Sequence, residues 1–165
     1  MKIENLKAQA KTVLEIISKN HPKAYATIAL LEWTVNTIKI VATDGFILYQ
    51  SNEVPCDTGI ECESARREIP IEVVKLLAAG KVVEYVGDMF ICGGVSIAPS
   101  SIKFPNYKQV LDGFLGSKES EKVKMQGDFL AAAKHMGKFI ITLKTEGVLI
   151  QGDKGTLIVC GMVEG

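Results

Sequence analysis

The chain has 165 residues and a mass of 17.9 kDa, which is enough for one domain, or one and a half small ones. Hydrophobic residues make up 47% and charged residues 23%, a globular composition that excludes a disordered chain. Basic residues (19) balance acidic residues (19), which excludes a uniformly basic nucleic-acid-binding protein. The charges are nevertheless segregated, because residues 1–23 hold five lysines against two glutamates, whereas residues 44–72 hold seven acidic residues against two arginines.

No pattern in the sequence indicates a membrane span, a catalytic site or a metal site. No apolar run approaches the roughly 18 residues that cross a bilayer, and the N-terminus lacks the apolar stretch of a signal peptide. Nucleophile-elbow, P-loop, zinc-protease and dinucleotide-binding motifs are absent from the sequence. The cysteines form no CxxC pair; they are Cys56, Cys62, Cys92 and Cys160. We therefore expect reduced thiols, no metal, no cofactor, no membrane partner and a cytoplasmic protein that is not an enzyme.

The chain begins with a predicted unit of one helix and several strands. Asn5 is expected to cap a helix whose apolar stripe runs from Leu6 to Ile17, and His21-Pro22 ends it. Strands are predicted at residues 2–4, 25–33, 37–43 and 46–50.

A second unit repeats this order. A strand over 60–69 precedes a helix over 71–79, which begins after Pro70 and stops at Gly80. Strands are predicted at 82–86, 89–92 and 95–97, and a further extended stretch at 104–111.

A third unit follows a glycine-containing polar stretch at 112–121 that is typical of a linker. It comprises a strand over 122–126, a helix over 129–136 capped by Asp128, and strands over 139–143, 148–151 and 156–162. One unit cannot cover both its helix and its sheet, so units should pack in pairs, and the third has no partner within these 165 residues. The fold class is therefore α+β, with repeated strand–helix–strand–strand–strand units and helices on one face of antiparallel sheets.

Two segments resemble one known family. Ala42-Thr43-Asp44-Gly45 with Leu48 resembles the ATDGHRL motif in the middle domain of bacterial DNA polymerase III β sliding clamps. Residues 104–111, Phe-Pro-Asn-Tyr-Lys-Gln-Val-Leu, resemble the FPDYRRVLP segment that closes the same domain. The resemblance implies the DNA clamp fold, with a complete domain over 1–112, a linker over 113–121, and a half unit over 122–165 that is similar to the second half of the last clamp domain.

The resemblance also implies a function: a non-enzymatic processivity or tethering factor that encircles or binds double-stranded DNA without sequence specificity. Lysines on the inner helices would then attract phosphates through counterion release. The candidate DNA-facing residues are Lys7, Lys11, Lys19, Lys23, Lys75, Lys134 and Lys138. The alternative interpretation of each lysine is simple solvation of a polar helix face.

Clamps of this family also hold short hydrophobic peptides of DNA polymerase or other replication proteins in a pocket between their middle and last domains. The matching positions here are Thr43, Gly45, Phe46, Ile47, Leu48, Pro105, Val110, Ile158 and Cys160. The alternative is that these apolar strand residues belong to the core. Phe46-Ile47 replaces the usual His-Arg, which makes the pocket more apolar and changes the peptides it selects or leaves it permanently filled.

Three classes of function are compatible with the sequence. The leading one is the clamp-like factor, assembled as a homodimer through the third units or as four copies with twelve units. The second is a degenerate clamp-fold module that binds a replication protein as regulator or decoy without holding DNA. The third is an enzyme without a recognisable catalytic motif.

Overall fold

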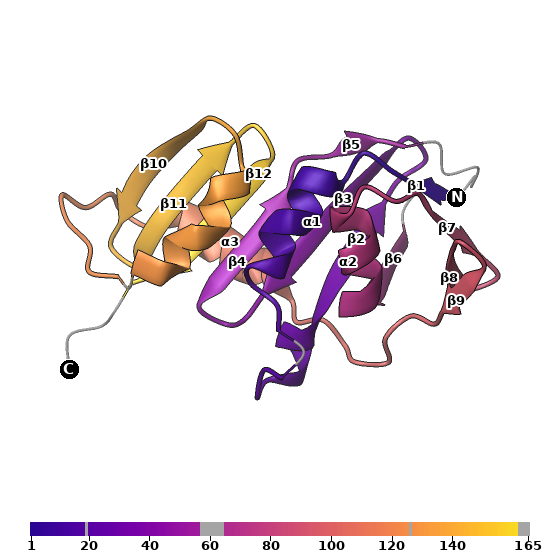
Figure 1. Ribbon diagram of the computed structural model, residues 1–165. Helices are drawn as coiled ribbons and strands as arrows, with labels where there is room; N and C mark the ends of the chain where they lie inside the picture. The colour runs from indigo at the N-terminus through magenta and orange to yellow at the C-terminus, as the bar shows by residue number, and fades with distance from the viewer. Residues whose placement is uncertain (19, 57–64, 126, 162–165) are drawn as a thin grey trace.

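The computed structural model describes residues 1–18, 20–56, 65–125 and 127–161, which form two antiparallel sheets (Figure 1). The strands of the larger sheet are β2 (Ile28–Trp33), β3 (Thr37–Thr43), β4 (Ile47–Ser51), β5 (Val54–Pro55), β6 (Ala65–Pro70), β10 (Phe139–Lys144), β11 (Gly147–Gly152) and β12 (Gly155–Cys160). Their order is β10-β11-β12-β4-β3-β2-β6, and β5 pairs with β3. The smaller sheet has the order β1-β7-β8-β9, from β1 (Lys2–Ile3), β7 (Val83–Val86), β8 (Met89–Cys92) and β9 (Val95–Ile97).

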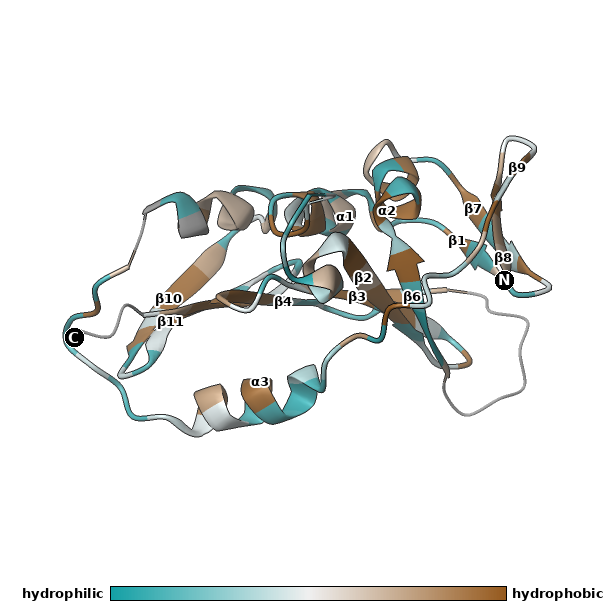
Figure 2. Cartoon of the chain, turned by 90° about the horizontal axis from the view of Figure 1, so that it is seen from below, coloured by the Kyte–Doolittle hydropathy of each residue, from teal (hydrophilic) through white to brown (hydrophobic). Residues whose placement is uncertain are grey.

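Helices cover both faces of the larger sheet. The α-helices are α1 (Lys7–Leu14), α2 (Ile71–Ala78) and α3 (Tyr107–Gly116), and the 3-10 helices are η1 (Ala24–Thr27) and η2 (Gly127–His135). Figure 2 shows α1 and α2 on one side of the sheet and α3 on the other. Because η2 packs against α1, it belongs to the same helix layer. Within the described residues, no helix is long and apolar enough to cross a bilayer.

Successive side chains of a strand point to opposite faces of the sheet, which produces two apolar layers, one on each face. Leu157 and Val159 point into the larger cluster beneath α1, α2 and η2, whereas Ile158 between them points into a smaller cluster beneath α3. The smaller cluster also contains Phe114 of α3 and Leu48 of β4. The sheet is therefore buried on both faces where α3 crosses it. The predicted α+β class with antiparallel sheets is confirmed, but α3 departs from the expected placement of all helices on one face.

The segment around residue 110 differs from the prediction. The extended stretch expected over 104–111 is wrong from Tyr107 onward, because α3 forms from Tyr107 to Gly116 and also makes the first residues of the predicted linker helical. Tyr107, Leu111 and Phe114 recur at helical spacing and pack beneath the helix in the smaller cluster. This burial stabilises the helix despite Gly113 in its interior.

The first helix is shorter than predicted, and its N-terminus is built differently. Leu6 occupies the N-cap position, no side chain caps the helix, and α1 ends at Leu14. Asn5 has a φ of 63°, so it turns the chain from β1 into the helix instead of capping it. The strand predicted to begin at residue 25 begins at Ile28, after η1.

The third unit is less regular than predicted. Residues 122–125 form no strand, and residue 126 lies outside the described residues, as do 60–64 of the predicted strand 60–69 and Met162 of the last. The predicted helix over 129–136 is the 3-10 helix η2, and Asp128 lies inside its first turn. The three strands that follow are confirmed, and β12 pairs with β4, which joins the third unit to the first. The division into a domain over 1–112, a linker and a half unit over 122–165 stays a prediction.

Candidate functional site

The turn between β3 and β4 is fixed by its own side chains. The hydroxyl of Thr43 donates to the carbonyl of Ile47 (2.7 Å) and accepts from the amide of Gly45 (3.1 Å). The carboxylate of Asp44 accepts from the amides of Phe46 (2.8 Å) and Ile47 (2.7 Å). Gly45 has a φ of 93°, which favours glycine, and a Cβ there would lie 2.7 Å from the Tyr25 hydroxyl. These requirements explain the Thr-Asp-Gly sequence at this turn.

Two further segments enclose the space beside this turn. Strand β12 pairs with β4 so that Ile158 lies opposite Leu48, and the amide of Cys160 donates to the carbonyl of Phe46 (2.8 Å). The first turn of α3 approaches from the other side and contributes Tyr107 and Val110. The result is an apolar cavity of about 190 Å³ on the α3 side of the sheet.

All nine residues predicted for a peptide pocket line this one cavity. The lining comprises Tyr25, Thr43, Gly45, Phe46, Ile47, Leu48, Pro105, Tyr107, Val110, Ile158 and Cys160. Tyr25 and Tyr107 are the two that the sequence did not indicate; the tyrosine in the Phe-Pro-Asn-Tyr motif was an available signal for the second. None of the lining side chains is a carboxylate, an ammonium or a guanidinium, so the cavity suits apolar groups. Its volume is below the roughly 300–1,000 Å³ of small-molecule sites.

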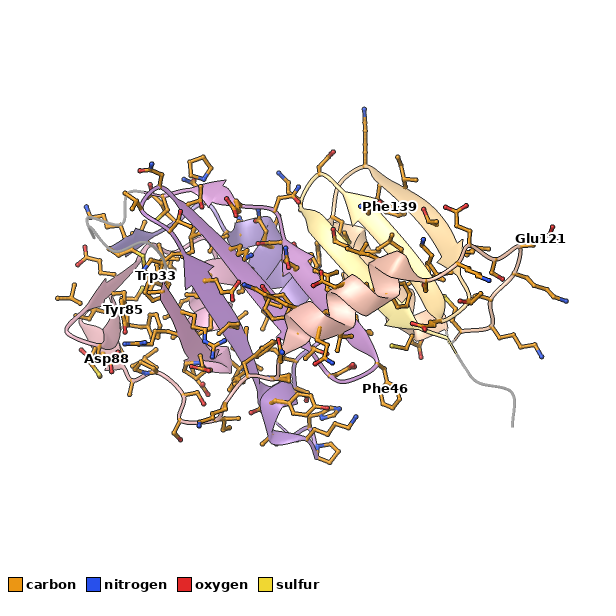
Figure 3. The ribbon with its side chains drawn as sticks, turned by 180° about the vertical axis from the view of Figure 1, so that it is seen from behind. Trp33, Phe46, Tyr85, Asp88, Glu121 and Phe139 are labelled. Carbon is orange, nitrogen blue, oxygen red and sulfur yellow. The ribbon has the colours of Figure 1, made fainter. Side chains whose placement is uncertain are left out.

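Phe46 and Lys23 form the rim of the cavity. Phe46 is 51% exposed and projects from the β3–β4 turn (Figure 3). The ammonium of Lys23 lies 4.7 Å from the centroid of the Phe46 ring, a cation–π contact. The structure thus places Lys23 beside the apolar cavity and gives the rim a positive charge.

Tyr107 anchors α3 to the sheet. Its hydroxyl donates to Oε2 of Glu32 (2.6 Å), and the ammonium of Lys39 lies 3.2 Å from the same oxygen. Burial, followed by the nearby carboxylate of Glu32, raises the pKa of Tyr107, so the phenol stays protonated and keeps donating. The bond fixes the helix turn that carries Val110.

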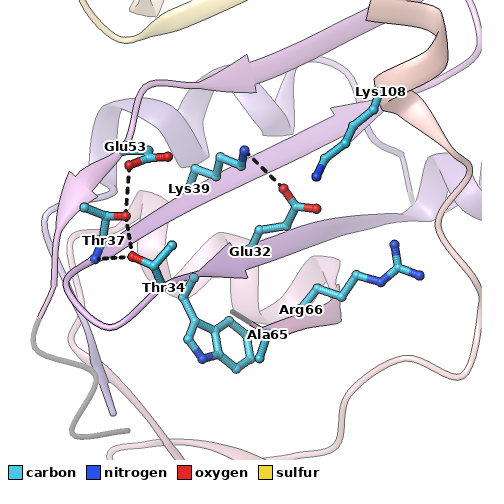
Figure 4. Close-up of a pocket in the computed structure, with 9 residues that line it drawn as sticks. Glu32, Thr34, Thr37, Lys39, Glu53, Ala65, Arg66 and Lys108 are labelled. Carbon is cyan, nitrogen blue, oxygen red and sulfur yellow. Dashed lines mark hydrogen bonds and ion pairs between the residues drawn. The ribbon is translucent and has the colours of Figure 1, made fainter. Parts of the chain in front are cut away.

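Glu32 and Lys39 belong to a second cavity, of about 450 Å³, that is polar (Figure 4). Thr34 and Thr37 share a hydrogen bond of 2.9 Å, and Thr37 donates to Glu53 (3.0 Å). The nine residues of the predicted peptide pocket all lie elsewhere. Glu32, which lines the polar cavity, holds α3 in position through its hydrogen bond with Tyr107. The polar cavity is distinct from the predicted pocket.

The thiol of Cys160 lies at the edge of the apolar cavity. Burial, and then the carboxylates of Asp44 and Glu146, raise its pKa. A raised pKa keeps the thiol neutral and weakly nucleophilic at neutral pH. Cys160 therefore contributes a small, uncharged side chain to the lining of the cavity.

The candidate DNA-facing lysines are distributed unevenly. Lys7 and Lys11 on α1, Lys75 on α2 and Lys134 on η2 are exposed in one helix layer. Lys138 is exposed just after η2, and its backbone amide donates to Asp153 (3.2 Å). Lys23 lies at the cavity instead, and Lys19 lies outside the described residues.

Lys134 is partly neutralised within the chain. Its ammonium lies 2.7 Å from Glu15, just after α1, and His135 lies 3.4 Å from the same carboxylate oxygen. The hydrogen bond from Lys134 is the main reason why the pKa of Glu15 is lowered. Lys7, Lys11 and Lys75 are therefore the stronger candidates for phosphate contacts.

Comparison with solved structures identifies the fold as that of bacterial sliding clamps. A putative DNA polymerase III β subunit from Eubacterium rectale matches 99% of this chain and 65% of its own, at 11% identity and a TM-score of 0.71. The Helicobacter pylori β clamp bound to a DNA ligase peptide matches 99% of this chain and 66% of its own, at 14% identity and a TM-score of 0.72. The β subunit from Thermotoga maritima matches the whole chain and 65% of its own, at 13% identity and a TM-score of 0.67.

The chain thus resembles these clamps along almost its whole length but spans just under two-thirds of theirs. No protein-family model and no curated protein matches its sequence. The predicted clamp fold is confirmed, in shortened form.

Proposed function

We propose that this chain is a clamp-like, non-enzymatic tethering factor that docks short hydrophobic peptides of replication proteins and binds duplex DNA without reading its sequence. The observation that carries the proposal is the apolar cavity, because residues far apart in the sequence converge on it at the positions expected for a peptide pocket. One structural neighbour, the H. pylori β clamp, binds a DNA ligase peptide, which supports this class of ligand.

The cavity favours a peptide with a large apolar side chain flanked by an acidic residue. Its uncharged lining accepts the apolar group, which is removed from water on binding. Lys23 at the rim would attract the acidic residue while Phe46 covers the apolar one. The DNA-binding part of the proposal rests on the exposed lysines of α1 and α2, on the opposite side of the sheet (Figure 2).

The peptide part is tested with fluorescence anisotropy of a labelled peptide that contains adjacent leucine and phenylalanine residues and one aspartate. Val110 lines the cavity and is 55% exposed, so Val110→Glu puts a carboxylate at the mouth with little risk to the fold. We expect at least a roughly tenfold weaker affinity, because the carboxylate must lose water against an apolar ligand.

Leu115→Glu is the matched control on the same helix. Leu115 is 42% exposed and does not line the cavity, so this variant should bind the peptide as the parent chain does. Equal affinity for all three proteins, or no measurable binding by the parent chain, would contradict peptide docking in this cavity.

A second candidate function is a module that binds a replication protein as regulator or decoy and holds no DNA. The observation in its favour is the reduced supply of available lysines, since Lys134 is paired with Glu15 and Lys23 lies at the cavity. Peptide binding without salt-sensitive DNA binding would select this function over the first.

A further inference from the structure

The apolar cavity and the polar cavity lie at opposite ends of one row of side chains. Every second residue of β3 faces α3, so Thr37 and Lys39 line the polar cavity and Thr43 lines the apolar one. Val41, which lies between Lys39 and Thr43, is buried in the smaller cluster beneath α3. The two cavities therefore lie on the same face of the larger sheet.

The contact between Tyr107 and Glu32 forms a wall common to both cavities. Tyr107 lines the apolar cavity, Glu32 lines the polar one, and the phenol donates to the carboxylate at 2.6 Å. Lys108, the next residue of α3, lines the polar cavity. A peptide held in the apolar cavity therefore has the polar cavity as its neighbour, beyond a single side-chain contact.

The polar cavity has an excess of positive charge. Its lining includes three cationic side chains from different elements, Lys39 of β3, Arg66 of β6 and Lys108 of α3 (Figure 4). Lys39 and Arg66 lie directly opposite Glu32 on the two neighbouring strands, and Lys39 pairs with Glu32 at 3.2 Å. Arg66 and Lys108 are exposed, and among the described residues neither lies within ion-pair distance of a carboxylate. Glu53 is the second carboxylate of the lining.

The chemistry of the polar cavity suits a peptide with acidic side chains better than a nucleic-acid backbone. Its volume of about 450 Å³ lies within the roughly 300–1,000 Å³ of ligand sites, whereas the apolar cavity is smaller. A guanidinium and an ammonium bind carboxylates through charge-assisted hydrogen bonds. The two glutamates of the lining would repel a continuous row of phosphates more strongly than one or two carboxylates.

We propose that the polar cavity binds acidic side chains of the same peptide whose hydrophobic residues fill the apolar cavity. This inference rests on the proposed function and extends its site past the first turn of α3. Lys39 and Thr43 are roughly 13 Å apart along β3, at about 3.3 Å per residue. An extended peptide covers this distance with about four residues, which sets the spacing between its hydrophobic pair and its acidic residues.

The position of Lys23 sets the order of the groups along the peptide. Lys23 contacts Phe46 in the turn that follows Thr43, at the end of β3 away from Lys39. The aspartate attracted by Lys23 and the acidic residues bound in the polar cavity therefore lie on opposite sides of the hydrophobic pair. The matching peptide has one aspartate, then leucine and phenylalanine, then a spacer and two glutamates, in one of the two chain directions.

Fluorescence anisotropy with matched peptides tests the proposal. Each chain direction is represented by the short labelled peptide, by an extension that ends in two glutamates, and by the same extension with two glutamines. In one direction, we expect the glutamate peptide to bind the parent chain about threefold to tenfold more tightly than the glutamine peptide, as for one or two partly exposed ion pairs. This gain should shrink at higher salt.

The two arginines of the chain supply a matched pair of variants. Arg66→Gln should remove most of the gain from the glutamates, because Arg66 lines the polar cavity. Arg67→Gln removes the same charge from the next residue of β6, but Arg67 pairs with Asp88 at 2.9 Å and lines neither cavity. It should therefore keep the full gain. Circular dichroism and thermal unfolding check that both variants fold.

The outcomes separate this inference from the proposed function. If the short peptide binds but the glutamates give no gain in either direction, or the same gain in Arg66→Gln, the inference is overturned and peptide docking stands. If no peptide binds, both fail. Equal affinity of the glutamate peptide for Val110→Glu and for the parent chain would separate the acidic segment from the apolar cavity and overturn the shared site. A single-stranded oligonucleotide whose binding weakens in Arg66→Gln would assign the polar cavity to phosphates and overturn it too.

Discussion

The carboxylate of Glu15, just after α1, ties the third unit to the first. It accepts from Lys134 at 2.7 Å and lies 3.4 Å from His135, both on η2. The hydrogen bond from Lys134, opposed by partial burial, lowers the pKa of Glu15 from its ordinary value of 4.5. A carboxyl group whose pKa is lower in the folded than in the unfolded chain stabilises the fold fully at pH values above its unfolded-state pKa. This stabilisation is lost as the pH falls through its folded-state pKa.

Replacing this carboxylate therefore gives a pH-dependent change in stability. Glu15→Gln should lower the free energy of unfolding at pH 7 by about 0.5 kcal/mol, because the pair is partly exposed. The difference from the parent chain should be full above pH 4.5 and shrink as the pH falls from 4.5 through the lower folded-state pKa, where the folded carboxylate becomes protonated, in urea unfolding series at several pH values. Glu4→Gln, on an exposed glutamate before α1, is the control; the same pH profile in both variants would exclude a specific role for Glu15.

Among the elements, the β12–β4 pairing determines whether the cavity exists, since it brings Ile158 beside Leu48. The pairing begins at Gly155, which lies opposite Ser51 and has a φ of 153°. A Cβ at Gly155 would collide with the carbonyl of Gln50 and lie 2.7 Å from the Cα of Ser51. The backbones approach closely only because this residue is glycine.

Two glycine substitutions should consequently have opposite effects. Gly155→Ala should destabilise the chain by about 2–4 kcal/mol and weaken peptide binding, because β12 must move from β4. Gly113→Ala, inside α3 with open space around its position, should stabilise the chain by about 0.5–1 kcal/mol through the higher helix propensity of alanine. Thermal unfolding of both variants measures the contrast, and a neutral Gly155→Ala would refute the close approach of the two strands.

At the scale of the whole molecule, the larger sheet separates two surfaces. The helix layer carries Lys7, Lys11 and Lys75, whereas α3 and the apolar cavity lie on the opposite face (Figures 2 and 3). A zero net charge therefore coexists with a local group of lysines. In the proposed function this separation lets one molecule hold DNA and a peptide at the same time.

DNA binding through the helix layer predicts a specific salt dependence. Lys7→Gln combined with Lys11→Gln should weaken binding to a labelled duplex and reduce the slope of log affinity against log salt by about 1.8, or about 0.9 for each phosphate that a lysine no longer neutralises. The control is Lys108→Gln on α3, an exposed lysine on the opposite face, which should leave the slope unchanged. An equal reduction in both proteins would indicate unspecific charge attraction instead of a DNA-facing helix layer.

The sequence was most informative where a residue's role depends on its immediate neighbours. The turn at residues 43–47 is held by hydrogen bonds within five residues, so its motif could be recognised, whereas the cavity residues were predicted only through the resemblance of two motifs to sliding clamps. The helix α3 was missed because polar residues and Gly113 mask its apolar positions, and its burial depends on a sheet formed by distant strands. Tyr25 was missed for the same reason: no local pattern links it to β12.

The amino-acid sequence by itself thus determined the antiparallel α+β class, the placement of most strands and the residues of the turn, since periodicity and turn chemistry act over a few residues. The tertiary structure alone decided that β12 pairs with β4, that Tyr107 anchors α3 through Glu32, and that β10 comes last in the strand order of the larger sheet. These features depend on contacts between residues up to about a hundred positions apart, as between Leu48 and Ile158. Such pairings are set by the burial of whole sheet faces and by close backbone approach at single glycines, which no local pattern encodes.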